Sequence, residues 1–266
     1  MNIRKTLWII PALLLIAAMG VPAAHAQAPP PGYIWDVYSV NPGTLTSYTQ
    51  FSSSSSTPVS FVADNASEYV SFAFRETPAY FAFDNAVVNL AGSSTNLLAD
   101  PGFESASDGQ NCNHDNSLGC PAGWGAWIQA IDTSAIGQVA TSSAHYGCNV
   151  GAYAGTNFWC DGSVQGYDAV FQQLTGLTVG STYDVSFWLE DDSTRAMTAA
   201  TSESCTSTEG SCIDMLVYAG DSLPVGSIVL STPEPGSLGF MLIGLGSLGL
   251  MLVVRKRISR ALSQAT

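Results

Sequence analysis

The feature that most constrains the fold is the pattern of residues 27–232, where short apolar-patterned runs alternate with clusters of Gly, Ser, Thr, Asn and Asp. We find no long helical period in this region, whereas a period of two recurs. In the run 70–76, Val, Phe and Phe share one face, and in the run 183–191 Tyr, Val, Phe and Leu do the same. The pattern predicts an all-β protein in which each of these two strands buries one face.

Further strands are expected in four other runs that are rich in apolar and aromatic residues and are separated by turn residues. This spacing of short strands and turns is typical of a β-sandwich. The region is long enough for one such domain to bury its own core. The four runs are 33–40, 80–90, 170–177 and 212–220.

Apolar blocks at both ends lie outside the predicted sandwich. Residues 1–26 begin with Arg4 and Lys5, continue with an apolar stretch and end with small residues, which is the order of a secretory signal peptide. An uncleaved membrane helix is the alternative, but the apolar stretch is short and contains Pro11. The protein is therefore expected to be exported, with its exported domain at 27–232.

Charge is distributed unevenly between the ends and the centre. The chain contains 21 acidic and 8 basic residues, and its formal net charge is −13. All the acidic residues lie between Asp36 and Glu234, and of the basic residues only Arg75 and Arg195 lie there. Such a field repels nucleic acid and anionic lipid, and it suits calcium, cationic partners or neutral glycans. Nucleic acid is therefore excluded as a partner.

All 6 cysteines lie in the exported region, where an oxidising environment favours disulfides. Proximity in the sequence suggests three pairs that each close a small loop, although other connectivities remain open. A zinc site built on Cys112, His114 and Cys120 is the alternative, but its spacing is irregular and export disfavours free thiolates. The suggested pairs are Cys112 with Cys120, Cys148 with Cys160, and Cys205 with Cys212.

A second apolar run lies near the C terminus. Residues 238–254 carry no charge and are just long enough to form a transmembrane helix. A Pro-Glu-Pro motif precedes this run, and a basic cluster that should remain cytoplasmic follows it. The residues of the motif and of the cluster are Pro233, Glu234, Pro235, Arg255, Lys256 and Arg257.

This order of motif, apolar span and basic cluster resembles the PEP-CTERM sorting signal of Gram-negative bacteria. The resemblance covers residues 233–257, within a sorting segment expected at 233–260. It implies an inner-membrane intermediate that an exosortase recognises and cleaves, after which the protein reaches the cell surface or the extracellular matrix. The two prolines suit this role because they keep the chain before the helix extended and accessible to a protease.

Three stretches of the exported region resemble galactose-binding-like jelly rolls, a group that includes carbohydrate-binding modules. In those modules the half with Gly-Phe-Glu comes first, whereas here the run 48–90 resembles the closing half and precedes it. We therefore expect a circularly permuted jelly-roll β-sandwich in which residues 33–90 and 96–230 form one core. Two small tandem domains are the alternative. The three stretches are 96–105, 123–127 and 170–193.

The same resemblance implies a structural calcium ion. The matching positions are Glu104 in the Gly-Phe-Glu motif and Asp84 in the run 80–90, with Asp100 as a nearby candidate. Calcium takes about six to eight oxygen ligands, which these carboxylates and backbone carbonyls would supply. The alternative is that Asp84 and Asp100 are solvated turn residues.

A sugar-binding surface would offer flat aromatic rings that pack on the apolar face of a pyranose, with polar groups beside them. Alternation predicts that Trp188 lies on the polar side of its strand, and two other tryptophans lie in loops rich in Gly and Cys. For each ring the alternative is that it covers an end of the core. The candidates are Trp124, Trp127, Tyr146, Tyr153, Trp159 and Trp188.

Catalysis is not expected. No arrangement of Ser, His and acid is recognisable, and the adjacent acids Asp191 and Asp192 are more typical of a solvated edge or a cation site than of glycoside hydrolysis. We expect a non-catalytic exported protein that binds or organises extracellular polysaccharide. The alternatives are a structural surface protein that self-associates or contacts proteins through calcium, and a glycoside hydrolase.

Overall fold

The computed structural model of the chain describes most of the region between the two apolar ends. The predicted signal peptide, the sorting segment and the apolar run 238–254 lie outside the described residues. Within the described part of the chain, no helix is both long enough and apolar enough to cross a membrane. The described ranges are 28–53, 58–77, 79–111, 120–129, 137–141, 147–206 and 211–224.

The described residues form β-strands with almost no helix, as the alternating pattern predicts. A 3-10 turn η2 (Val37–Ser39) and one short helix α2 (Glu203–Thr206) are the helical elements in these ranges. The strands are β1 (Trp35–Asp36), β2 (Thr49–Phe51), β3 (Ser60–Val62), β4 (Ser67–Glu76), β5 (Phe81–Leu90), β6 (Gly125–Ile128), β7 (Gln138–Ala140), β8 (Phe158–Asp161), β9 (Asp168–Thr175), β10 (Thr182–Asp191) and β11 (Ile213–Gly220).

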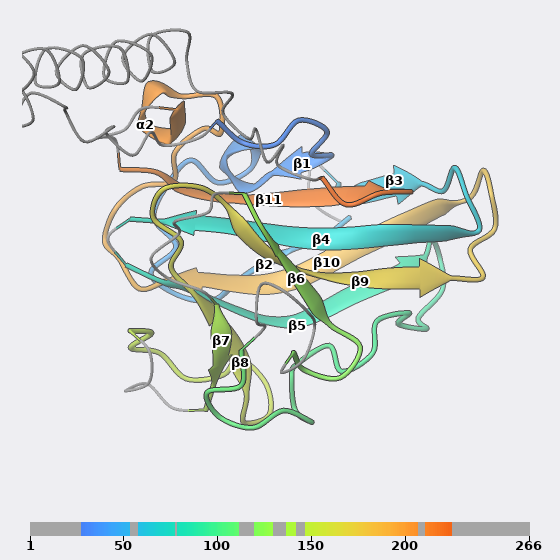
Figure 1. Cartoon of the computed structure of the whole chain (residues 1–266), viewed down its shortest axis with the longest axis horizontal. Helices are drawn as coiled ribbons and strands as arrows, with labels where there is room; N and C mark the ends of the chain where they lie inside the picture. The colour runs from blue at the N-terminus through green and yellow to red at the C-terminus, as the bar shows by residue number, and fades with distance from the viewer. Residues whose placement is uncertain are drawn as a thin grey trace, which may run out of the picture. The chain divides into compact units, whose positions relative to one another are not determined.

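Two antiparallel sheets pack as a β-sandwich, which confirms the predicted fold class (Figure 1). The first, called sheet 1 here, has the order β1-β11-β4-β9-β6, and sheet 2 has the order β2-β10-β5-β8-β7 with β3 also paired to β10. Strands from the early and late parts of the chain alternate in both sheets. In sheet 1, β4 lies between β11 and β9, and in sheet 2, β5 lies between β10 and β8.

Aromatic rings from both sheets form the centre of the core. Phe72 of β4 lies 4.8 Å from Phe83 of β5 and 5.6 Å from Phe187 of β10, measured between ring centroids, and all three side chains are fully buried. Truncating such a ring to Ala typically costs about 3–5 kcal/mol. Because the three rings come from distant parts of the sequence, residues 28–90 and the later strands depend on one another for burial.

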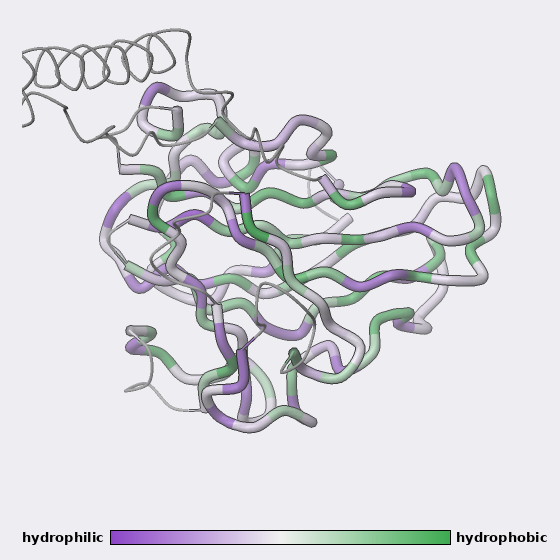
Figure 2. The backbone as a smooth tube through the Cα atoms, in the orientation of Figure 1, coloured by the Kyte–Doolittle hydropathy of each residue, from purple (hydrophilic) through white to green (hydrophobic). Residues whose placement is uncertain are grey.

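Strand β4 departs from the prediction that each strand buries one face. Its polar-side residues Ser71, Ala73 and Arg75 are as buried as its core-facing residues. The reason is a second apolar layer that covers the outer face of sheet 1 and is built from residues such as Tyr167 and Leu216. Strand β10 agrees with the prediction, with Tyr, Val, Phe and Leu buried and the alternate residues partly exposed. Figure 2 shows hydrophobic and hydrophilic positions interspersed along the long strands.

The N-terminal segment of the described chain lies against the last strand. The backbone N–H of Ile34 donates to Val217 O at 2.8 Å, and the Tyr218 hydroxyl donates to Pro30 O at 2.9 Å. The Gln129 side-chain amide donates to Ala28 O. These contacts place residues near 30 next to β11, whose end leads toward the predicted sorting segment.

Candidate functional site

The candidate site is built around Trp188, which β10 holds on the outer face of sheet 2. Its neighbours Phe187 and Leu189 point into the core, so alternation directs Trp188 outward, where it is half-buried. The register pairs Trp188 with Asp84 of β5 and with Gln50 of β2, and an irregularity in the β5 pairing lies between Ser186 and Trp188. A bulge of this kind re-aims a side chain at the sheet surface.

Tyr153 stacks on Trp188. The ring centroids are 3.7 Å apart and the rings are inclined by 15°, while 41% of Tyr153 remains exposed to solvent. Tyr48 packs edge-on against Tyr153 at 5.6 Å, and its hydroxyl donates to Gly151 O at 3.0 Å. These three rings, called the aromatic cluster here, form a surface that combines stacked and edge contacts. Each such contact contributes about 0.5–1.5 kcal/mol beyond the area that it buries.

A disulfide and two carboxylates hold the loop that carries Tyr153. Cys148, near the start of this loop, is bonded to Cys160 in β8. The backbone N–H of Ala154 donates to Asp84 Oδ2 at 2.9 Å, and that of Thr156 donates to Glu104 Oε1 at 2.9 Å. Charge-assisted hydrogen bonds of this kind are stronger than neutral ones. Asp84 and Glu104 therefore position the loop over Trp188.

Gly155 is required at the centre of this loop. It has a φ of +70°, a conformation that residues with a side chain rarely adopt. A Cβ atom at Gly155 would also clash with Glu104 Oε1. Any larger residue would displace the carboxylate from the N–H groups of Thr156 and Asn157 that it accepts.

Asp84 and Glu104, two of the three predicted calcium ligands, lie around one turn. A side chain at Gly102 would lie 3.3 Å from Asp84 Oδ1 and 3.8 Å from Glu104 Oε1, so both carboxylates approach this glycine. Burial raises the pKa of Asp84 to about 6, and the nearby Glu104 carboxylate adds to the rise, while N–H donors oppose it. The carboxylate of the third predicted ligand, Asp100, accepts instead from Ser105 N and from Ser105 Oγ, the latter at 2.6 Å.

Two further acids lie next to the aromatic cluster. Glu190 follows Trp188 on the same face of β10 and accepts a hydrogen bond from the backbone N–H of Tyr48. Burial and the charge of Asp192 raise the pKa of Glu190. Asp192 Oδ2 accepts from the Asn149 side-chain amide at 2.6 Å. The cluster is thus bordered by acidic groups that are fixed by hydrogen bonds.

Among the described residues, the other predicted aromatic candidates Trp124, Trp127 and Trp159 lie away from the pair of Trp188 and Tyr153. Trp124 and Trp159 are buried in the core, where both rings contact Phe103, with centroid distances of 4.9 and 5.7 Å. Trp127 is half-buried and packs edge-on against Tyr218 at 5.7 Å. Tyr146 lies outside the described residues. Sequence reasoning did not single out Tyr48, although an aromatic ring in the polar stretch 44–50 was an available signal.

The adjacent acids Asp191 and Asp192 do not face one another. Asp191 is 1% exposed, and its carboxylate accepts from the backbone N–H and the hydroxyl of Ser193. Asp192 contacts Asn149 on the outer surface. Alternation along a strand separates the two side chains, so this run presents two single carboxylates rather than a pair.

A different set of acids lies inside one end of the sandwich. The register places Asp191 and Asp161 on either side of Phe81, and Asp168 beside Phe74, all on faces directed toward the core. Glu76 faces the same interior at the end of β4. We call these four residues the inner acids. They form two pairs that each join sheet 1 to sheet 2, Glu76 with Asp191 and Asp168 with Asp161.

The inner acids have pKa values above the ordinary range. Burial raises the pKa of Glu76 to about 8, and the charge of Asp191 contributes to the rise. Burial also raises the pKa of Asp161 to about 6, although hydrogen bonds with Asp168 and Trp159 act to lower it. Burial raises the pKa of Asp168 well above its usual value, and the charge of Asp161 and the hydrogen bond with it add to that rise. Within the described ranges, Glu76 Oε2, Asp161 Oδ1 and Asp168 Oδ1 have no hydrogen-bond donor. Protons are therefore expected to reside in these pairs near neutral pH.

Two of the three predicted disulfides are present, Cys148–Cys160 and Cys205–Cys212. Cys120 is also disulfide-bonded, whereas Cys112 lies outside the described residues. Within the described ranges, the one group of three metal-type ligands combines Cys205 and Cys212 with Asp214. Because those two sulfur atoms are bonded to each other, this group does not provide thiolates for a metal ion.

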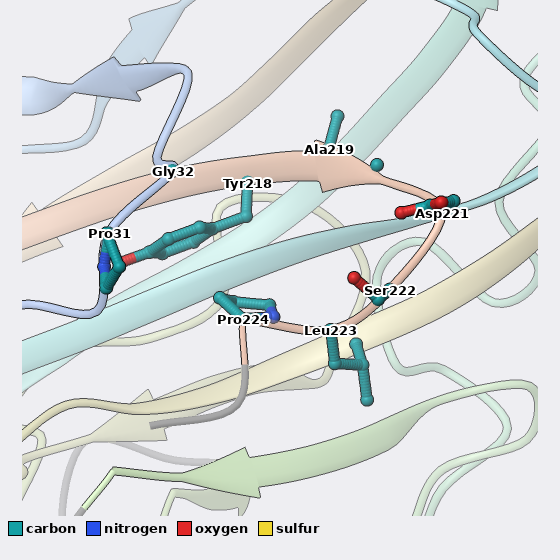
Figure 3. Close-up of a pocket in the computed structure, with 9 residues that line it drawn as sticks. Pro31, Gly32, Tyr218, Ala219, Asp221, Ser222, Leu223 and Pro224 are labelled. Carbon is teal, nitrogen blue, oxygen red and sulfur yellow. The ribbon is translucent and has the colours of Figure 1, made fainter. Parts of the chain in front are cut away.

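A pocket of about 210 Å³ lies where the two ends of the described chain meet (Figure 3). It is lined by Pro31 and Gly32 on one side and by residues 218–224 on the other. Figure 3 shows the Tyr218 ring directed toward Pro31. The pocket therefore marks the junction of the first and last described segments, on β11 of sheet 1, whereas the aromatic cluster belongs to sheet 2.

Comparison with known proteins assigns the C-terminal segment. Residues 231–257 match the PEP-CTERM protein-sorting motif. Neither the curated proteins nor the solved structures yield a match to this chain. The motif implies export through a membrane-anchored intermediate and processing by an exosortase. The fold and the motif together define a surface-sorted β-sandwich protein, and the predicted apolar run 238–254 agrees with the transmembrane helix that such a motif contains.

Proposed function

We propose that this protein is a non-catalytic component of the cell surface or extracellular matrix of a Gram-negative bacterium, and that it binds extracellular polysaccharide through the aromatic cluster. The stacking of Tyr153 on Trp188 carries this proposal, because it holds a partly exposed ring in a fixed position beside the outer face of sheet 2. Flat rings beside polar groups are what pyranose recognition requires. The resemblance to galactose-binding-like jelly rolls supports the same function.

Retardation in affinity gels that contain extracellular polysaccharide would test this function. The protein is expressed with its own leader and sorting segment and purified after export. We expect that Tyr153→Ala abolishes retardation, because it removes the exposed ring. Tyr38→Ala is the matched control, since Tyr38 is 37% exposed but lies in η2, away from the aromatic cluster. Equal retardation of the wild type and Tyr153→Ala would contradict the proposal.

A structural calcium ion at Asp84 and Glu104 is a second proposal. Its support is that both carboxylates approach Gly102 from neighbouring segments, so that their free lone pairs and nearby carbonyls could serve one ion. Such an ion would fix the loop that carries Tyr153. We expect calcium to raise the melting temperature of the wild type and not that of Glu104→Gln. A melting temperature that neither calcium nor a chelator changes would contradict this proposal.

A further inference from the structure

The charges around the aromatic cluster indicate which class of glycan it binds, if the proposed function is correct. Asp84 lies beside Trp188 in the register, and Glu190 follows Trp188 on the same outer face of β10. Asp192 is held nearby through Asn149. Two partly exposed carboxylates, Glu190 and Asp192, and the fully buried Asp84 thus border the two stacked rings, one of which is half-exposed.

The positive charges of the sandwich lie elsewhere. Six of the 8 basic residues belong to the terminal segments, which leaves Arg75 and Arg195 in the exported region. Arg75 is buried on the outer side of sheet 1, where it donates to Cys205 O at 2.6 Å. Arg195 donates to Thr77 O at 2.9 Å, at the end of the sandwich that holds the inner acids. The acids beside the aromatic cluster therefore keep their negative field.

The negative charge of these acids also affects the pKa of Tyr48. Burial is the main cause of the rise in its pKa, and the charges of Asp84 and Glu190 add to it. A phenol becomes harder to ionise where the potential is negative. A uronate ligand placed on these rings would meet the same repulsion, whereas a cationic ligand would be attracted to both the carboxylates and the ring faces.

We infer that the aromatic cluster binds a glycan of amino sugars that carry free ammonium groups, such as a glucosamine polymer. The exposed ring of Tyr153 would pack on the apolar face of one pyranose. The partly exposed carboxylate of Glu190 would accept a charge-assisted hydrogen bond from the ammonium group. Charge complementarity between a cationic chain and this acidic border supports a positively charged glycan over a neutral or acidic one.

Calorimetry on the exported protein would test the inference with four oligosaccharides of equal length. They are a glucosamine oligomer, its N-acetylated form, a glucose oligomer and a uronate oligomer. We expect the glucosamine oligomer to bind about tenfold more tightly than its N-acetylated form, a preference that decreases as salt is added. Glu190→Gln should remove the preference and leave the weaker binding. Glu203→Gln makes the same change of net charge in α2 and should retain the preference.

The outcomes separate this inference from the proposed function. Equal binding of the charged and N-acetylated oligomers, with both lost in Tyr153→Ala, would overturn the inference and leave glycan binding intact. Binding of none of the four by a folded protein would overturn both. Stronger binding of an oligolysine than of the glucosamine oligomer would assign the surface to a cationic polypeptide and overturn the inference.

Discussion

Two sets of acids in this protein have similar side chains and opposite surroundings. Around the aromatic cluster, Asp84 and Glu104 accept backbone N–H groups of the loop 153–157. The inner acids instead face one another across the two sheets, and several of their oxygens lack a hydrogen-bond donor among the described residues. Donors favour the charged form of an acid, and burial beside another acid favours the neutral form. Burial nevertheless raises the pKa of both Asp84 and Asp161 to about 6, so the N–H donors around Asp84 moderate the effect of burial and do not cancel it.

The largest effect that would test this comparison is the pH dependence of Glu76. Its folded pKa of about 8 exceeds the unfolded value of 4.5, so the folded state binds more protons between these values. Its contribution to stability is therefore complete below about pH 4.5 and is lost as the pH rises to about 8. We expect a total loss of roughly 3–5 kcal/mol. Urea unfolding of the wild type and Glu76→Gln at pH 5 and pH 9 measures it. If the variant is no more stable relative to the wild type at pH 9 than at pH 5, the folded protein does not raise the pKa of Glu76 and the prediction is wrong.

Removing the disulfide Cys148–Cys160 tests whether Asp84 and Glu104 can hold the loop 153–157 without it. Replacing both cysteines with Ser should cost about 3 kcal/mol, from the entropy of a loop that spans 12 residues. Because Asp84 and Glu104 still bind the loop backbone, we expect Tyr153 to stay on Trp188 in the folded variant. Tryptophan fluorescence quenching by iodide measures the exposure of Trp188. A marked increase in quenching would mean that the acids alone do not hold the loop.

The pair of Asp161 and Asp168 offers a smaller test. Asp168→Asn keeps a hydrogen-bond donor toward Asp161 and removes one ionisable group. The folded wild type retains a proton that the unfolded chain loses as the pH rises above the unfolded pKa of Asp168, so we expect the variant to gain about 1–3 kcal/mol of stability relative to the wild type between pH 5 and pH 8. Thermal unfolding at the two pH values measures the difference. If the variant is destabilised to a similar extent at both pH values, the packing of the Asp168 side chain matters more than its protonation.

The smallest expected effect concerns Glu104→Gln. The amide oxygen can still accept the N–H groups of Thr156 and Asn157, so only the charge of the acceptor is lost. We expect a decrease in the free energy of unfolding of about 1 kcal/mol, measured by urea denaturation without calcium. Glu203→Gln, in the exposed helix α2, should change it by less. If both variants change the free energy of unfolding equally, the hydrogen bonds that Glu104 accepts from the loop contribute nothing measurable to stability.

The sequence predicts the strands well because alternation is a local property. The apolar face of β10 and the outward position of Trp188 follow directly from the order of its residues. The burial of both faces of β4 does not, since Arg75 and Ser71 are covered by residues far along the chain. The aromatic cluster is also non-local, because a disulfide and two carboxylates bring Tyr153 to Trp188. Residue type alone likewise could not distinguish the core rings Trp124 and Trp159 from surface rings.

The position of β4 between β9 and β11 has a consequence for the timing of folding. Strand β4 is synthesised early, but its two neighbours end at Thr175 and Gly220. The edge of β4 that pairs with β9 stays unpaired until Thr175 has been made, and the edge that pairs with β11 until Gly220 has been made. Such distant pairings form slowly. Residues 221–230 alone separate β11 from the sorting motif. The last strand that the sandwich needs therefore lies directly before the sorting motif, so the fold can be completed only after nearly all of the chain before the motif is available.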